Sequence, residues 1–240
     1  MNYRSKVLNK EESIKFLKKQ NFLLNIDIIE NLQNEDSHVV SLDEKGFLIE
    51  SHETQLISFE DKSQIKFFDE KIDNSKIIVV HQEFYKDHLI EKGFTVLSKC
   101  HQASYEGTPF YLDLPSDVDI KFLTLNQLDF VFSHYNKFVD LEYLKERIAN
   151  KKMVGLFFQN QITGFIGIHR EGAMGMLEID EKYRRRNFAT FLEKYIINRQ
   201  LEEHKIPYCQ IIQGNLKSLS LQKKLGFSFS EEMIFWMKKL

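Results

Sequence analysis

A strand, a short basic turn and a long helix follow one another between Met174 and His204. The strand spans 174–179, the turn contains the three consecutive arginines 184–186, and the helix begins at Asn187. A strand and the helix after it both bury an apolar face, so they pack as two layers. This segment therefore predicts a layered α/β structure.

The neighbouring segments extend this pattern across the C-terminal half of the chain. Apolar periodicity and turn signals predict alternating strands and helices there. The expected strands are 120–123, 153–158, 163–169, 174–179, 208–213 and 227–237, and the expected helices are 125–137, 141–150, 187–204 and 216–225. We expect an α/β (α+β) fold whose mixed, mostly antiparallel central sheet is flanked by helices.

The N-terminal half contains the same kinds of element. The expected helices are 11–19, 22–32 and 82–92, and the expected strands are 38–42, 46–50, 54–59, 78–80 and 94–105. The segment 106–116 holds Pro109 and Pro115, two of only three prolines, and is predicted to link two domains. We place these domains at 1–115 and 116–240.

Composition excludes several classes of protein. With 240 residues, 42% of them hydrophobic and a net charge of −2, the chain suits a folded protein without a global attraction to nucleic acid or membrane. Cys100 and Cys209 fit neither a disulfide framework nor a metal site. The N-terminus is charged, and no apolar run could span a membrane, so we expect a cytoplasmic monomer or homodimer without metal.

The basic turn is a candidate phosphate site. The first N–H groups of a helix lack intrahelical partners and carry partial positive charge, so they bind anions. The arginines 184–186 add charge, Ala189 keeps the backbone accessible, and Asn187 is able to cap the helix. The alternative is a solvated basic turn at the start of an ordinary helix.

A second candidate segment lies at 207–227. A strand ends at Gly214-Asn215, a helix follows, and Gly226-Phe227 opens the last strand. Asn215 is expected to cap this helix while its amide faces a ligand.

These two segments together resemble the GNAT superfamily of N-acyltransferases. The family's patterns Arg/Gln-x-x-Gly-x-Gly/Ala and Asn-x-x-Ser/Ala-x-x-Leu-Tyr-x-Lys-Leu-Gly-Phe bind coenzyme A, and the second is matched over thirteen residues from Asn215 to Phe227. The resemblance implies acetyl-CoA as co-substrate and a primary amine of a small molecule or peptide as acceptor. It implies that the cofactor-binding residues are Leu177, Ile179, Arg184, Arg185, Arg186, Asn187, Phe188, Ala189, Thr190, Asn215, Ser218 and Gln222.

The chain departs from the family patterns at two positions. Asn187 replaces a glycine, and asparagine tolerates a positive φ better than most residues. Gln222 replaces the tyrosine that protonates the departing thiolate, and an amide cannot act as an acid. The run Gln-Lys-Lys-Leu-Gly at 222–226 is similar to the glycine N-acyltransferase-like branch, so Gln222 does not by itself indicate loss of activity.

Three residues are candidates for the general base that this chemistry needs. Glu178 alternates with Leu177 and Ile179 and so points to the opposite face of the sheet; the alternative is a solvent-facing residue. His169 ends the preceding strand and Glu171 follows in the turn, and both positions also suit ordinary hairpin residues. Tyr135, Phe138 and Tyr143 lie in the helix pair that shapes the acceptor pocket in this family, as core or as pocket lining.

Two further interpretations concern the whole chain. The segment 84–94 is again a helix that ends in Gly-Phe before a strand, so the N-terminal domain is interpreted as a degenerate GNAT-like copy in a tandem pair, or as a chance likeness. The competing function is a non-catalytic module that binds acyl-CoA or a protein. Nucleic-acid binding is disfavoured, since three adjacent arginines lack interleaved aromatic residues.

Overall fold

The structure, a computed structural model, describes residues 7–34, 37–135 and 139–239. Its residues form two compact units. The first contains the residues up to Ser104, Gln210–Lys223 and the residues from Phe227 onward, and the second contains Tyr105–Cys209 and Lys224–Gly226. The division into domains 1–115 and 116–240 stays a prediction.

The first unit is built on a sheet in the order β1-β2-β3-β4-β11-β5. Its elements are α1 (Lys10–Asn21), α2 (Ile26–Leu32), β1 (Ser37–Asp43), β2 (Gly46–Ser51), β3 (Thr54–Ser58), α3 (Ile65–Asp69), β4 (Ile77–Val80), α4 (Glu83–Glu91), β5 (Phe94–Ser104), β11 (Ser228–Lys239) and most of α8 (Leu216–Leu225). All strand pairs are antiparallel except β3 with β4. The C-terminal strand β11 therefore completes the sheet of the N-terminal residues.

The strands of this sheet bury apolar side chains on both faces. Ile49 of β2 packs in the cluster that contains Leu17 of α1 and Ile29 of α2. The adjacent Leu48 packs in the opposite cluster with Tyr85 of α4. This alternation follows from the two-residue period of a strand. Helix α3 was not predicted, because five residues are too few to show a helical period.

The second unit is built on a sheet in the order β10-β9-β8-β7-β6. Its elements are β6 (Val118–Phe122), the 3-10 helix η2 (Leu125–Gln127), α5 (Leu128–Tyr135), α6 (Leu141–Ala149), β7 (Met153–Phe158), β8 (Gln161–Ile168), β9 (Met174–Ile179), the 3-10 helix η3 (Glu181–Tyr183), α7 (Phe188–Glu202) and the start of β10 (Tyr208–Ile212), whose residues from Gln210 onward belong to the first unit. The pairs from β6 to β9 are antiparallel, and β9 with β10 is parallel.

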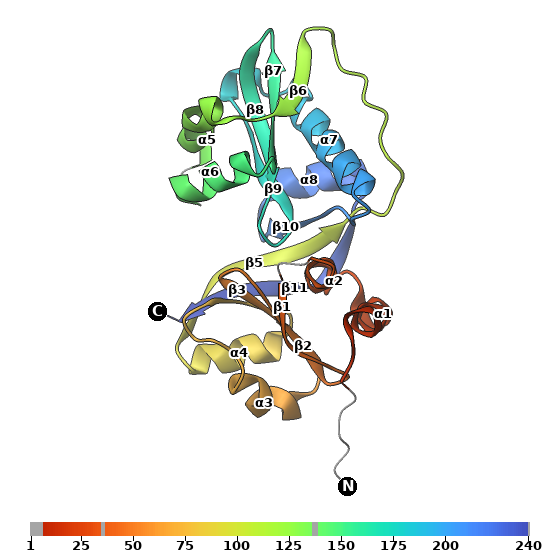
Figure 1. Ribbon diagram of the computed structural model, residues 1–240, viewed down its shortest axis with the longest axis vertical. Coiled ribbons are helices and arrows are strands. Elements are labelled where there is room, and N and C mark those ends of the chain that lie inside the picture. Colours follow the sequence, from red (N-terminus) through yellow and green to blue (C-terminus); the bar gives the residue numbers. More distant parts are fainter. Residues whose placement is uncertain (1–6, 35–36, 136–138, 240) are drawn as a thin grey trace. The chain divides into compact units, whose positions relative to one another are not determined.

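Helices cover both faces of this second sheet. Figure 1 shows α5 and α6 on one side of β7 and β8 and α7 on the other. The predicted fold class, a mixed α/β fold with a mostly antiparallel sheet flanked by helices, is confirmed. The end of the helix predicted at 125–137 lies outside the described residues, as does Phe138. The interpretation of the chain as a tandem pair stays a prediction.

A β-bulge in β9 determines which side chains share a face. Gly175 pairs with Gly167 of β8, and Glu178 pairs with Phe165. Three steps along β9 thus match two steps along β8, and Met176 within the bulge has a φ of +54°. Because paired residues point to the same side of a sheet, Gly175 and Glu178 lie on one face of β9. In a regular strand, residues three positions apart would lie on opposite faces.

Within residues 7–34, 37–135 and 139–239, no helix is long and apolar enough to cross a membrane.

Candidate functional site

The N-terminus of α7 presents three backbone amides. Asn187 precedes the helix with φ +65° and ψ +9°, the left-handed conformation that the sequence predicted it would tolerate. The first intrahelical bond runs from the N–H of Phe191 to the carbonyl oxygen of Asn187, at 3.1 Å. The N–H groups of Phe188, Ala189 and Thr190 therefore have no acceptor within the helix. The expected side-chain cap is wrong, because the Asn187 side chain accepts no capping hydrogen bond. Side-chain capping goes with extended φ and ψ angles at the N-cap residue, which Asn187 does not have.

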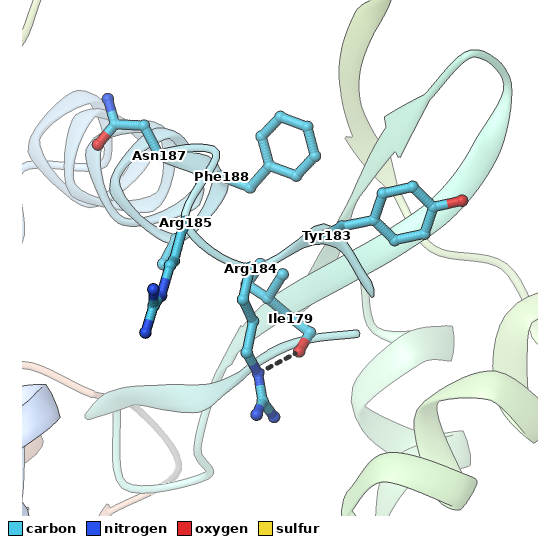
Figure 2. A pocket seen from close by; sticks show the side chains of 7 residues that line it. Ile179, Tyr183, Arg184, Arg185, Asn187 and Phe188 are labelled. Atoms are coloured by element: carbon cyan, nitrogen blue, oxygen red, sulfur yellow. Dashed lines mark hydrogen bonds between the residues drawn. The ribbon is translucent and has the colours of Figure 1, made fainter. Parts of the chain in front are cut away.

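A cavity of about 360 Å³ opens beside this helix end. Figure 2 shows its lining, which comes from the end of β9, the turn and the start of α7. The lining residues are Ile179, Tyr183, Arg184, Arg185, Asn187, Phe188 and Ala189. A recess with helix N–H groups and guanidinium groups on its wall suits an anion such as a diphosphate.

The three arginines of the turn have different surroundings. Arg184 donates from Nε to the carbonyl oxygen of Ile179 at 3.2 Å and forms an ion pair with Glu181 at 2.9 Å. The guanidinium of Arg186 lies 5.1 Å from the ring centroid of Phe158, a cation–π distance. Arg185 is exposed and has no ion-pair partner in the described part of the chain. Arg185 is therefore the guanidinium most available to an anion, and in Figure 2 it extends beside Arg184.

Two of the remaining predicted residues of the turn pack inward. Phe188 is buried, with its ring 5.7 Å from that of Phe158, and Thr190 is buried as well. Leu177 is half-buried within the bulge, where it has no register partner in β8. Phe188 and Thr190 therefore contribute backbone N–H groups to the helix end, and their side chains support the turn.

Glu178 faces the helices α5 and α6. It lies opposite Phe165, whose ring packs edge-on against Tyr135 of α5 at a centroid distance of 6.5 Å. Burial raises the pKa of Tyr135 to about 12, and the charges of Glu178 and Glu171 add to this effect. Tyr135 therefore keeps its proton at neutral pH, close to Glu178.

His169 and Glu171 lie at the adjacent hairpin. Nδ1 of His169 is 2.9 Å from the hydroxyl of Tyr143 on α6. Burial raises the pKa of Tyr143, and the charge of Glu171 raises it further. The carbonyl oxygen of Glu171 accepts a hydrogen bond of 2.5 Å from the hydroxyl of Tyr208. The fold thus gathers all three candidate bases around Tyr135 and Tyr143.

The sequence left the role of these two tyrosines open. They are spaced eight residues apart on two helices, and their common position depends on the α5–α6 packing against β9. As for metals, within the described residues no three His, Cys, Asp or Glu side chains gather in an arrangement that could hold an ion.

Comparison with known proteins identifies the family. A family model described as an acetyltransferase (GNAT) domain matches residues 116–235, half of the chain. The chain belongs to the GNAT acetyltransferases. No curated protein matches the sequence of this GNAT chain.

Solved structures share the GNAT fold of this chain. A Drosophila protein is similar over 98% of both chains with a TM-score of 0.72 and 14% identity. A GCN5-related N-acetyltransferase from Kribbella flavida covers 92% of this chain and 96% of its own, with a TM-score of 0.61 and 10% identity. One from Sphaerobacter thermophilus covers 97% and 93%, with a TM-score of 0.54 and 7% identity. At such identities the likeness shows the fold alone.

The second GNAT motif lies on α8. Asn215 caps this helix as predicted, since its Oδ1 accepts a hydrogen bond of 3.2 Å from the N–H of Ser218. Ser218 is half-buried, and Gln222 is only 2% exposed. The assignment of these residues to the coenzyme site stays a prediction, like that of the residues around α7.

Proposed function

We propose that this GNAT chain transfers an acetyl group from acetyl-CoA directly to a primary amine of a small molecule or peptide. One observation carries the proposal: the left-handed Asn187 opens α7 so that the start of the helix, with Phe188 and Ala189, lines a cavity beside Arg185. Such a helix end provides both hydrogen-bond donors and positive potential for a diphosphate.

The residues of β9 supply the groups that acyl transfer requires. Acetyl-CoA provides the activated acyl group as a thioester. The carboxylate of Glu178 takes a proton from the acceptor ammonium, and His169 and Glu171 are the alternative bases. Backbone N–H groups of 177–179 stabilise the negative charge on the acyl oxygen. The amine nitrogen bonds to the acyl carbon, the C–S bond breaks, and the nitrogen releases its second proton through water, which protonates the departing thiolate.

Three finer assignments belong to this proposal. The run 222–226 supports a place in the glycine N-acyltransferase-like branch. The cap at Asn215 supports its role in coenzyme binding, together with Ser218 and Gln222. The two thiols, Cys100 and Cys209, are free and buried, which supports a reducing compartment such as the cytoplasm.

Gln222 favours one alternative, a GNAT-fold module that binds acyl-CoA without turnover. Its amide occupies the position of the family's acidic tyrosine and cannot protonate a thiolate. Turnover across a panel of amines decides between the two functions.

Titration calorimetry with acetyl-CoA, followed by thiol release in the presence of amines, tests the proposal. Binding with amine-dependent thiol release is expected, and the protein's own thiols should add little signal because both are buried. Binding without release from any amine would favour the alternative. No heat at millimolar acetyl-CoA would refute both.

A further inference from the structure

The backbone around His169 is fixed by the β8–β9 hairpin. The N–H of His169 donates to the carbonyl oxygen of Ala173 at 2.8 Å, and the N–H of Gly172 donates to the carbonyl oxygen of His169 at 3.0 Å. Since both polar groups of its backbone are held, the position of the imidazole depends only on the contacts of the side chain.

Two contacts set the position of the ring. Nδ1 lies 2.9 Å from the hydroxyl of Tyr143. The opposite edge lies over Gly175 of β9, where an added Cβ would come within 2.6 Å of Nε2 and 2.8 Å of Cδ2. Any residue other than glycine at position 175 would therefore displace the ring.

Tyr143 is itself held in place by charged neighbours. The guanidinium of Arg170 lies 5.1 Å from its ring centroid and that of Arg147 lies 6.0 Å from it. Both arginines form ion pairs with Glu146. The phenol therefore has little freedom to turn away from His169.

The state of the phenol indicates where its proton lies. Burial and the charge of Glu171 raise the pKa of Tyr143, so the phenol keeps its proton. A phenol has one proton to donate, and the partner at hydrogen-bond distance for that proton is Nδ1 of His169. A neutral imidazole whose Nδ1 accepts a hydrogen bond carries its own proton on Nε2.

We propose that Tyr143 is a positioning residue that holds His169 in the tautomer protonated on Nε2. In this tautomer His169 is a hydrogen-bond donor, and its lone pair on Nδ1 is occupied by Tyr143. Proton abstraction from the acceptor then falls to Glu178, which shares the face of Gly175. The catalytic part of this inference rests on the proposed acyl transfer, whereas the tautomer does not.

Long-range ¹H–¹⁵N spectroscopy of the uniformly ¹⁵N-labelled protein at pH 8, without coenzyme, measures the tautomer directly. His169→Gln identifies the signals. We expect a protonated Nε2 and an Nδ1 that accepts a hydrogen bond. A proton on Nδ1 in the neutral ring would overturn the proposal. The tautomer is measured on the wild-type protein, so the result does not depend on the folding of a variant.

Tyr143→Phe tests the positioning role. It should move the Nδ1 resonance toward that of a free acceptor nitrogen and lower kcat about tenfold, with KM for acetyl-CoA unchanged. Gly175→Ala should shift the same resonance, and Tyr111→Phe, at a phenol that is 85% exposed, should not. An unchanged resonance in Tyr143→Phe would refute the role. Absence of acetyl-CoA binding would instead defeat the proposed function and leave the spectroscopic result standing.

Discussion

Glu178 and Gly175 face the same side of β9 although they lie three positions apart, an odd spacing that strict alternation would place on opposite faces. The bulge at Met176 is the cause, since it adds one residue to β9 relative to β8. As a result the carboxylate of Glu178 and the imidazole over Gly175 point toward the same helices, α5 and α6. Several properties of the site depend on this arrangement.

Glu178→Gln should lower kcat about 100-fold with the best acceptor amine, because an amide cannot take a proton from the ammonium. The dissociation constant for acetyl-CoA should change less than twofold. Steady-state kinetics and calorimetry on the same preparations measure both. Glu202→Gln, an exposed carboxylate near the end of α7, serves as the control. Equal turnover in Glu178→Gln would assign the base to another residue.

Arg185→Ala should weaken CoA binding about tenfold, since it removes a charge-assisted hydrogen bond to the diphosphate. Its exposed side chain has no ion-pair partner in the described segments, so the melting temperature should not move. Pantetheine, which lacks the diphosphate, should bind wild type and variant equally. Arg184→Ala should weaken CoA binding and also lower the melting temperature, because Arg184 is bonded to Ile179 and Glu181. An unchanged affinity in Arg185→Ala would place the diphosphate elsewhere.

Asn187→Gly should preserve CoA binding, because glycine adopts the observed φ of +65° without steric cost. Asn187→Val should destabilise the fold by about 1–2 kcal/mol and weaken CoA binding, since a β-branched residue is strained in the left-handed region. Denaturant unfolding and calorimetry on this pair of variants provide the measurements. Equal stability of the two variants would contradict the left-handed turn.

Glu146 should make stability depend on pH in the acid range. Burial alone would raise the pKa of Glu146, but hydrogen bonds from Arg147, Arg170 and Asn150 outweigh it and hold the pKa at about 2, below its ordinary value of 4.5. A lowered pKa in the folded state adds stability above pH 4.5 that is lost as the pH falls toward 2.

The matched variants make this effect measurable. Glu146→Gln should lower the free energy of unfolding by about 1–2 kcal/mol at pH 7, allowing for solvent screening, and the difference should disappear near the acid end of the range. Glu142→Gln on the same helix changes an exposed pair with Lys145 and should cost less than about 0.5 kcal/mol. A difference for Glu146→Gln that stays constant from pH 7 to pH 3 would exclude this ionic origin.

The sequence by itself determined most of the order of helices and strands, the basic turn and the two helix starts, because these depend on signals within a few residues. The left-handed Asn187 and the cap by Asn215 are of this local kind. The GNAT motifs could be recognised for the same reason, since their spacing is fixed along the chain.

Only the tertiary structure decided the rest. Strict alternation predicted the face of Glu178 but could not predict that the bulge would bring Gly175 to the same face. The hydrogen bond between Tyr143 and His169 joins residues 26 positions apart. Strand β11 pairs with β4 and β5, which lie even farther from it in the sequence. Such relationships arise when elements remote in sequence bury their apolar faces together, and no local pattern encodes which partners will meet.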